Sequence, residues 1–202
     1  MLVDWSGALD AAAGLRLSQE LYGPDVDIAE LAIYQSWRKN NNQLTLCAFS
    51  LDRKECFAEL QILPLAESLI RDILSGKRKE SSIRPDEIRS YEAPGPYCLQ
   101  VTNAVTLPGR PELLLRLLLR YMDFWVEQYP DRYIKRVYTQ AVSERGFMLV
   151  QHFFMTPRFD LNFDAYMIDL AYPSASKIVQ QFKQQLEKKA PLPSELQWPP
   201  HK

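Results

Sequence analysis

The sequence predicts a single-domain α/β protein, in which helices flank a mixed central sheet. Strand-like segments rich in β-branched and apolar residues alternate with segments whose apolar residues recur at helical spacing. The chain has 202 residues, of which 47% are hydrophobic and 24% are charged. This length suits one domain, and this balance is far from that of disordered proteins. We expect a core over residues 25–190, an N-terminal extension over 1–24 and a proline-rich tail over 191–202.

The first half of the chain predicts helices around a hairpin. Residues 1–24 suit a short helix that either docks on the core or frays. Residues 25–40 carry apolar side chains at helical spacing and end in a run of asparagines. The apolar segments 44–52 and 56–64 are separated by three charged residues, which predicts a β-hairpin. Residues 66–80 predict a further helix with a glycine near its end.

The second half alternates between the two types of element. A polar connection with one helical turn at 85–88 leads to a buried strand at 97–107. A helix follows over 111–130, with proline in its first turn and apolar residues on nearly every face. The remaining segments predict, in order, a strand, a helix with a serine N-cap, a strand and an amphipathic helix: 132–142, 143–154, 163–172 and 174–189. This βαβ order predicts a mixed sheet with helical connections.

The charge balance argues against nucleic acid or membrane partners. Lys and Arg number 24 and Asp and Glu number 25, giving a net charge of -1. Acidic residues are interleaved with the basic stretches, so no basic surface is expected. The apolar run at 113–119 is interrupted by Arg116 and is too short to span a bilayer. The start of the chain lacks the basic segment of a secretory signal. We therefore expect a cytoplasmic protein.

The cysteine and histidine content predicts no metal centre. Cys47, Cys56 and Cys98 have no close paired spacing, and His152 and His201 lie far from them in sequence. Each cysteine lies in an apolar run, so we expect three free, buried thiols. Aromatic residues at helical spacing in 121–133 suit either the core or an interface, and are compatible with a homodimer.

The order of elements over residues 25–172 resembles that of the GCN5-related N-acetyltransferase (GNAT) superfamily. The segment that carries this resemblance best is RVYTQAVSERGFMLVQHFFM, which is similar to the superfamily's strand followed by a capped helix. A second segment resembles a divergent, poorly characterised bacterial branch of the superfamily: LIRDILSGKRKESSIRPDEIRSYEAPGPYCLQVTNAV. The resemblance implies an N-acyltransferase that uses acetyl-CoA or another acyl-CoA and an unknown amine acceptor.

The resemblance also implies a phosphate-binding loop before the helix at 111–130. Superfamily members hold the pyrophosphate of CoA on backbone amides of a loop of the form Q/R-x-x-G-x-G/A. The matching positions here that we expect to contact the cofactor are Thr106, Leu107, Gly109 and Arg110. Two residues depart from the pattern, because Pro111 removes an amide donor and Glu112 places a negative charge where a diphosphate would lie. The same segment also suits an ordinary strand-to-helix turn, in which an acidic residue favours the helix N-terminus without any ligand.

The resemblance further implies a general acid in the helix over 143–154 and a general base on a strand. The position of the family's acidic tyrosine falls on Val150 and that of its glycine on Phe154, so His152 is the candidate acid. Either of two tyrosines elsewhere could replace it, Tyr138 or Tyr166. The candidate base is Glu59, although the sequence offers no partner to perturb its pKa and a solvated carboxylate on a strand is the simpler interpretation.

These departures leave two functional hypotheses. One is an acyl-CoA-dependent N-acyltransferase. The other is a non-catalytic GNAT-fold module that acts through protein contacts and has lost its cofactor loop. Few histidines and no G-x-S-x-G motif give little support to a serine hydrolase.

Overall fold

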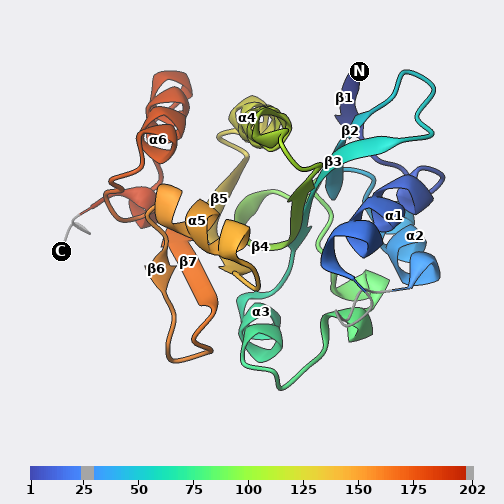
Figure 1. Ribbon diagram of the computed structural model, residues 1–202. Coiled ribbons are helices and arrows are strands. Elements are labelled where there is room, and N and C mark those ends of the chain that lie inside the picture. The colour runs from blue at the N-terminus through green and yellow to red at the C-terminus, as the bar shows by residue number, and fades with distance from the viewer. Residues whose placement is uncertain (24–29, 199–202) are drawn as a thin grey trace.

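The computed structural model describes residues 1–23 and 30–198 and is built around a seven-stranded mixed sheet (Figure 1). The strands in chain order are β1 (Leu2–Trp5), β2 (Thr45–Phe49), β3 (Cys56–Pro64), β4 (Gly95–Thr106), β5 (Arg132–Gln140), β6 (Thr156–Pro157) and β7 (Ala165–Asp169). Their order across the sheet is β1-β2-β3-β4-β5-β7-β6. Only β4 and β5 among these strands pair in parallel, and the α-helix between them makes the crossover that such a pair requires.

The described residues form six α-helices around this sheet. They are α1 (Ala11–Tyr22), α2 (Leu31–Asn40), α3 (Glu67–Leu74), α4 (Pro111–Gln128), α5 (Glu144–His152) and α6 (Lys177–Lys189). Three short 3-10 helices lie at Glu80–Ser82, Pro85–Glu87 and Ser194–Leu196. The predicted mixed α/β architecture, the hairpin of β2 and β3 and the serine cap of α5 are confirmed, since Ser143 Oγ accepts a hydrogen bond from the Gly146 amide.

The N-terminal residues contribute more to the sheet than the sequence indicates. Residues 1–23, expected as an extension with one short helix, form both β1 and α1, and β1 pairs antiparallel with β2. The helix predicted over 25–40 begins at Leu31 in the described chain, and the part of that prediction at 25–29 lies outside the described residues. The short edge strand β6 was not predicted, because two residues carry no readable alternation.

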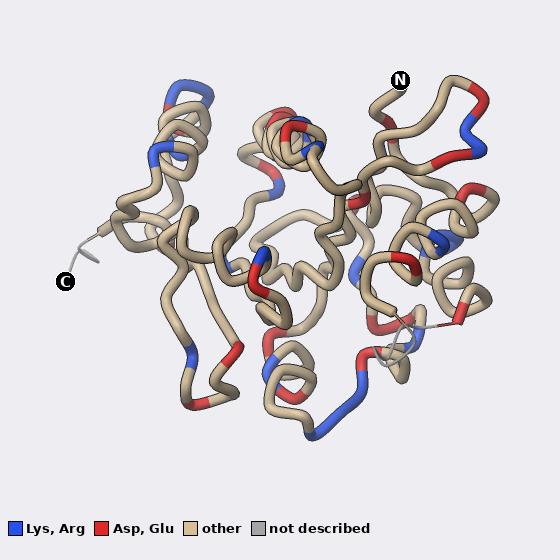
Figure 2. The backbone as a smooth tube through the Cα atoms, in the orientation of Figure 1, with Lys and Arg blue, Asp and Glu red and all other residues tan. Residues whose placement is uncertain are grey.

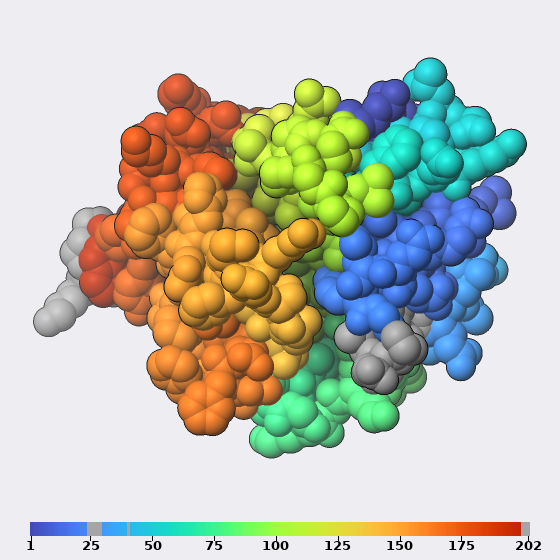
Figure 3. Space-filling view, viewed as in Figure 1, coloured from blue at the N-terminus to red at the C-terminus, as the bar shows by residue number. Residues whose placement is uncertain are grey.

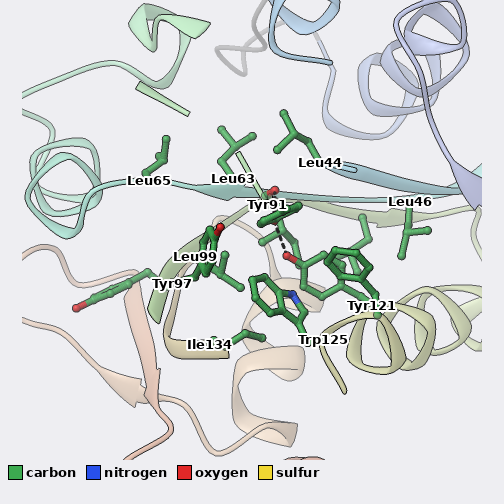
Figure 4. Close-up of a cluster of buried hydrophobic side chains, with 14 of the residues drawn as sticks. Leu44, Leu46, Leu63, Leu65, Tyr91, Tyr97, Leu99, Tyr121, Trp125 and Ile134 are labelled. Atoms are coloured by element: carbon green, nitrogen blue, oxygen red, sulfur yellow. Dashed lines mark hydrogen bonds between the residues drawn. The ribbon is translucent and has the colours of Figure 1, made fainter. Parts of the chain in front are cut away.

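A cluster of large buried side chains lies between the sheet and α4 (Figure 4). Helix α4 buries residues at positions that repeat every three or four along the chain: Leu113, Leu117, Tyr121, Phe124 and Trp125. Trp125 makes edge contacts with Tyr91 and Tyr97, at ring centroid distances of 5.3 and 5.1 Å. The hydroxyls of Tyr91 and Tyr121 lie 2.7 Å apart, so the buried polar ends of these rings satisfy each other. This aromatic packing holds the crossover helix against the parallel strands.

The charged residues are distributed over the whole fold. Figure 2 shows Lys and Arg interspersed with Asp and Glu along the elements, as the near-zero net charge predicts. Within the described residues, no helix is both long enough and apolar enough to cross a membrane.

Candidate functional site

Strands β4 and β5 separate at one end of their pairing. The pairs run from Gly95 opposite Arg132 to Val101 opposite Thr139, yet β4 continues to Thr106 while the last residue of β5 pairs with β7. In the antiparallel pairing with β3, the register shifts so that Thr102 is an extra residue in β4. A bulge of this kind bends its strand, which accounts for the separation. In Figure 3, β4 lies recessed between α4, α5 and α1 at this place.

The turn between β4 and α4 lies at the open end of these strands. The amide of Leu107 donates to the carbonyl of Phe57 and that of Arg110 donates to the carbonyl of Leu107, at 2.9 and 3.1 Å. Gly109 has φ +77°, a conformation that favours glycine, and a Cβ there would meet no atom of the described residues within 4 Å. Pro108 in the turn and Pro111 at the start of α4 both lack an amide donor. Among the described residues the amide of Gly109 has no hydrogen-bond acceptor, so it is free to face a ligand.

Side chains of the turn are also engaged with one another. Thr106 Oγ1 donates to the carbonyl of Arg110 at 2.8 Å. The guanidinium Nε of Arg110 lies 2.5 Å from a carboxylate oxygen of Glu112, and both side chains are about half exposed. The hydrogen bond from Arg110 lowers the pKa of Glu112, so this carboxylate stays ionised at the start of α4. A phosphate would therefore have to compete with Glu112 for Arg110.

Glu59, the candidate base, is buried beneath α1. Its side chain is only 2% exposed, and its Oε1 accepts a hydrogen bond from Asn103 Nδ2 at 3.0 Å. The guanidinium of Arg38 lies 3.8 Å from its Oε2. Burial raises the pKa of Glu59, and the charge of Arg38 opposes that rise only in part. Gly14 of α1 lies so close that a Cβ there would fall 1.6 Å from Oε2, so the helix covers the carboxylate.

Tyr22, which the sequence analysis did not identify, is linked through Asn103 to Glu59, close to the place where β4 separates from β5. Tyr22, the last residue of α1, donates its hydroxyl to Asn103 Oδ1 at 3.2 Å, and Asn103 follows the bulged residue of β4. Asn103 Nδ2 also donates to Ser18 Oγ at 2.7 Å. Burial, together with the charge of Glu59, raises the pKa of Tyr22 to about 12. No sequence signal marks this contact, because 81 positions separate Tyr22 and Asn103.

The structure does not bring His152 to Glu59. His152 is exposed at the end of α5, and the contact recorded for its ring is with the neighbouring Phe153, at 5.8 Å between centroids. The two alternative tyrosines differ in accessibility. Tyr138 is buried and donates to Glu67 Oε1 at 2.6 Å, and burial followed by this bond raises its pKa. Tyr166 is half-buried against the ring of Phe147. Tyr138 is therefore committed to a structural contact, whereas Tyr166 retains an accessible ring.

Two of the thiols lie beside Glu59 in an arrangement that resembles metal ligands. Cys47, Cys56 and Glu59 place one ligand-type atom each within 4.8 Å of one another. The thiol of Cys56 donates to the carbonyl of Ala58 at 3.2 Å, and burial raises the pKa of Cys47. The guanidinium of Arg38 next to the same carboxylate would repel a cation. These contacts therefore disfavour a bound cation at this place.

Comparisons with known proteins were informative at the level of structure. No protein-family model matches the chain, and no curated protein matches it. Among solved structures, an acetyltransferase candidate from Staphylococcus aureus Mu50 is similar, with a TM-score of 0.52 and 9% identity over 84% of this chain and 99% of that chain. The loading GNATL domain of CurA from Lyngbya majuscula gives a TM-score of 0.49 and 10% identity over 71% and 66% of the two chains. The chain has the GNAT fold.

One of the departures noted in the sequence lies at a residue with left-handed backbone. Phe154, where the resemblance implies a glycine, has φ +51° and an exposed side chain. Left-handed backbone favours glycine because a Cβ there crowds the following carbonyl, at a cost of roughly 1–2 kcal/mol. Phe154 adopts this conformation although it is not a glycine. Val150, where the resemblance implies a tyrosine, is buried and carries no proton to transfer.

Proposed function

We propose that the protein is a GNAT-like N-acyltransferase, which transfers an acyl group from acetyl-CoA or another acyl-CoA to an amine. The observation that carries the proposal is the separation of β4 from β5 beside the N-terminus of α4. Beyond Val101, one edge of β4 has no strand partner within the described part of the chain, so its backbone groups can bond the amides of a pantetheine arm. The helix N-terminus beyond it carries a partial positive charge that favours phosphate.

The proposed phosphate contacts come from the turn at Thr106 to Arg110. The free amide of Gly109 and the guanidinium of Arg110 would hold the pyrophosphate, and Thr106 and Leu107 would line the arm. Arg110 must first leave Glu112, which weakens the site relative to a glycine-rich loop. We therefore expect weak binding of CoA.

Neither the proposed base, Glu59, nor the proposed acid, His152, is placed for catalysis without a further condition. The raised pKa of Glu59 suits a base, yet Gly14 covers the carboxylate, so α1 must shift before an amine can reach it. His152 is exposed and could donate a proton to the departing thiolate only if the CoA sulfur reaches the end of α5. A direct attack of the amine on the thioester requires no other group from the protein.

A second function is supported by the turn itself. Pro108 in the turn, Pro111 at the start of α4 and the ion pair of Arg110 with Glu112 reduce the number of groups that can hold a diphosphate. These features favour the alternative of a non-catalytic GNAT-fold interaction module. The two functions differ in whether CoA binds.

Calorimetric titration of the protein with acetyl-CoA and with CoA tests the proposal. We expect binding that the substitution Arg110→Glu weakens by roughly tenfold, because a charge-assisted contact is lost. Glu112→Gln should strengthen binding, because it frees Arg110. Arg116→Glu, one turn further along the exposed face of α4, is the matched control and should have a smaller effect. Absence of binding at millimolar ligand would exclude the acyltransferase and leave the interaction module.

A further inference from the structure

Gln100 lies on β4, between the part of the sheet that α3 covers and the part that α1 covers. Side chains alternate along a strand, so Gln100 shares a face with Cys98, whose thiol lies 3.7 Å from Glu67 of α3. On the other side of Gln100, Asn103 bonds Ser18 of α1 on that face after the bulge. Gln100 therefore faces the interval between α3 and α1.

The side-chain carbonyl of Gln100 is buried without a partner. The residue is 3% exposed, and its Oε1 has no hydrogen-bond partner among the described residues. Buried polar groups are nearly always bonded, so a buried carbonyl with no bond requires an explanation.

A second buried glutamine on the same face provides the contrast. Gln61 of β3 donates from Nε2 to Thr45 Oγ1 at 3.2 Å, and its Oε1 accepts from Thr102 Oγ1 at 3.0 Å. Both ends of that amide are satisfied inside the protein. The fold is therefore able to pair a buried glutamine on this face, and it does not pair Gln100.

The other unpaired buried atoms have local explanations. Arg38 leaves only its Nε without a partner, since its terminal nitrogens contact Ser6 and Glu59. The indole nitrogen of Trp125 lies within the aromatic cluster of α4. Neither group lies on β4, whereas Gln100 stands opposite Tyr138, one pair before β4 and β5 separate.

We propose that Gln100 is a substrate-binding residue, whose Oε1 accepts a hydrogen bond from an N–H group of a molecule bound between β4 and β5. The inference rests on the proposed function, which offers two sources of that N–H: an amide of the pantetheine arm and the acceptor amine. In a buried site such a bond is strong, and a ligand without the N–H leaves the carbonyl unpaired. The Gln100 carbonyl is thus unsatisfied in the free protein and is satisfied by the ligand.

The first test measures the free protein. Gln100→Leu removes a buried carbonyl that has no partner among the described residues, so it should raise Tm by roughly 2–4 °C in a chain of this size. Gln61→Leu, the matched control, breaks two internal hydrogen bonds and should lower Tm. A fall in Tm for Gln100→Leu would overturn the proposal, because it would show that the amide already has a partner within the folded protein, such as an ordered water.

The second test measures ligands and separates the two sources. We expect Gln100→Leu to weaken the binding of either acetyl-CoA or n-pentylamine by roughly five- to tenfold, which corresponds to the loss of one hydrogen bond. Adenosine 3′,5′-diphosphate lacks the pantetheine amides, and pentyltrimethylammonium has the charge of the amine without its N–H. Both control ligands should bind the variant and the native protein equally. Weakening of acetyl-CoA assigns the pantetheine arm, and weakening of the amine assigns the acceptor.

The outcomes also separate this inference from the proposed function. If acetyl-CoA binds and Gln100→Leu changes neither ligand's affinity, the function stands and the inference is overturned. If acetyl-CoA does not bind but n-pentylamine binds in a manner that depends on Gln100, the inference stands without the acyltransferase. If neither ligand binds the native protein, both are overturned.

Discussion

At the scale of single residues, the most constrained contact joins Gly14 to Glu59. The glycine allows α1 to approach the buried carboxylate, and Arg38 and Asn103 hold the carboxylate in place. Sequence alone identified Glu59 as a strand carboxylate near the candidate site, but could not place it under a helix. A charge buried in this way needs its partners, because an unpaired buried charge is strongly destabilising.

Gly14→Ala tests this contact. In an exposed helix the substitution would stabilise by about 1 kcal/mol, because alanine is the better helix former. Here the added methyl group would meet the Glu59 carboxylate, so we expect a net loss of about 1–3 kcal/mol in the free energy of unfolding, measured in denaturant.

The control for this measurement is the same substitution in a Glu59→Ala background. The carboxylate is then absent, and Gly14→Ala should become neutral or stabilising. If Gly14→Ala stabilises the native background as well, the close packing of α1 on Glu59 is wrong.

At the scale of elements, α3 is fastened to β5 by charged and polar side chains. Glu67 in the first turn of α3 accepts hydrogen bonds from Arg136 at 2.8 Å and from Tyr138 at 2.6 Å. Arg136 also donates to Asp169 of β7 at 2.7 Å, so three elements meet at one guanidinium. The sequence predicted each of these elements, but periodicity says nothing about which polar ends meet.

The stability contributed by Glu67 should depend on pH. Burial alone would raise the pKa of Glu67, but the hydrogen bond from Tyr138 and the charge of Arg136 lower it below its ordinary value of 4.5. A carboxyl group with a lowered pKa stabilises the fold above the unfolded value, and this stability is lost as the pH falls through the folded pKa. We expect Glu67→Gln to cost about 1–2 kcal/mol at pH 7 and markedly less at pH 3.

Denaturant unfolding of the native protein and of Glu67→Gln at pH 7 and pH 3 measures how the cost of the substitution depends on pH. Glu127→Gln, which breaks an exposed ion pair with Arg120, is the control and should change stability little at either pH. A cost of Glu67→Gln that is equal at pH 7 and pH 3 would show that charge is not what fastens α3.

At the scale of the whole molecule, the N-terminal residues complete the fold. Strand β1 covers the edge of β2, and Trp5 packs its ring against Phe124 of α4 at 5.2 Å between centroids. The first residues of the chain therefore connect one edge of the sheet to the crossover helix. Their composition gave no sign of this, since four residues are too short for a readable strand pattern.

Deletion of residues 1–5 tests this role. We expect loss of cooperative unfolding or a fall in Tm of more than about 8 °C, which corresponds to at least about 2 kcal/mol, together with aggregation through the uncovered edge of β2. Circular dichroism and light scattering measure the two effects. Removal of Met1 alone is the control, and an unchanged Tm after deletion of all five residues would show that β1 is dispensable.

Local patterns in the sequence predicted most of the helices and strands, and hence the mixed α/β class, but neither β1 nor β6. Apolar spacing at 97–107 and 111–130 reports local burial, which one segment reveals without knowledge of its neighbours. Which of these elements lie side by side follows from the tertiary structure alone. The bulge at Thr102, the cover over Glu59 and the unpaired carbonyl of Gln100 all depend on contacts between positions far apart in the chain. Such contacts follow from strand register and helix packing, which are set by the whole fold, so no local pattern encodes them.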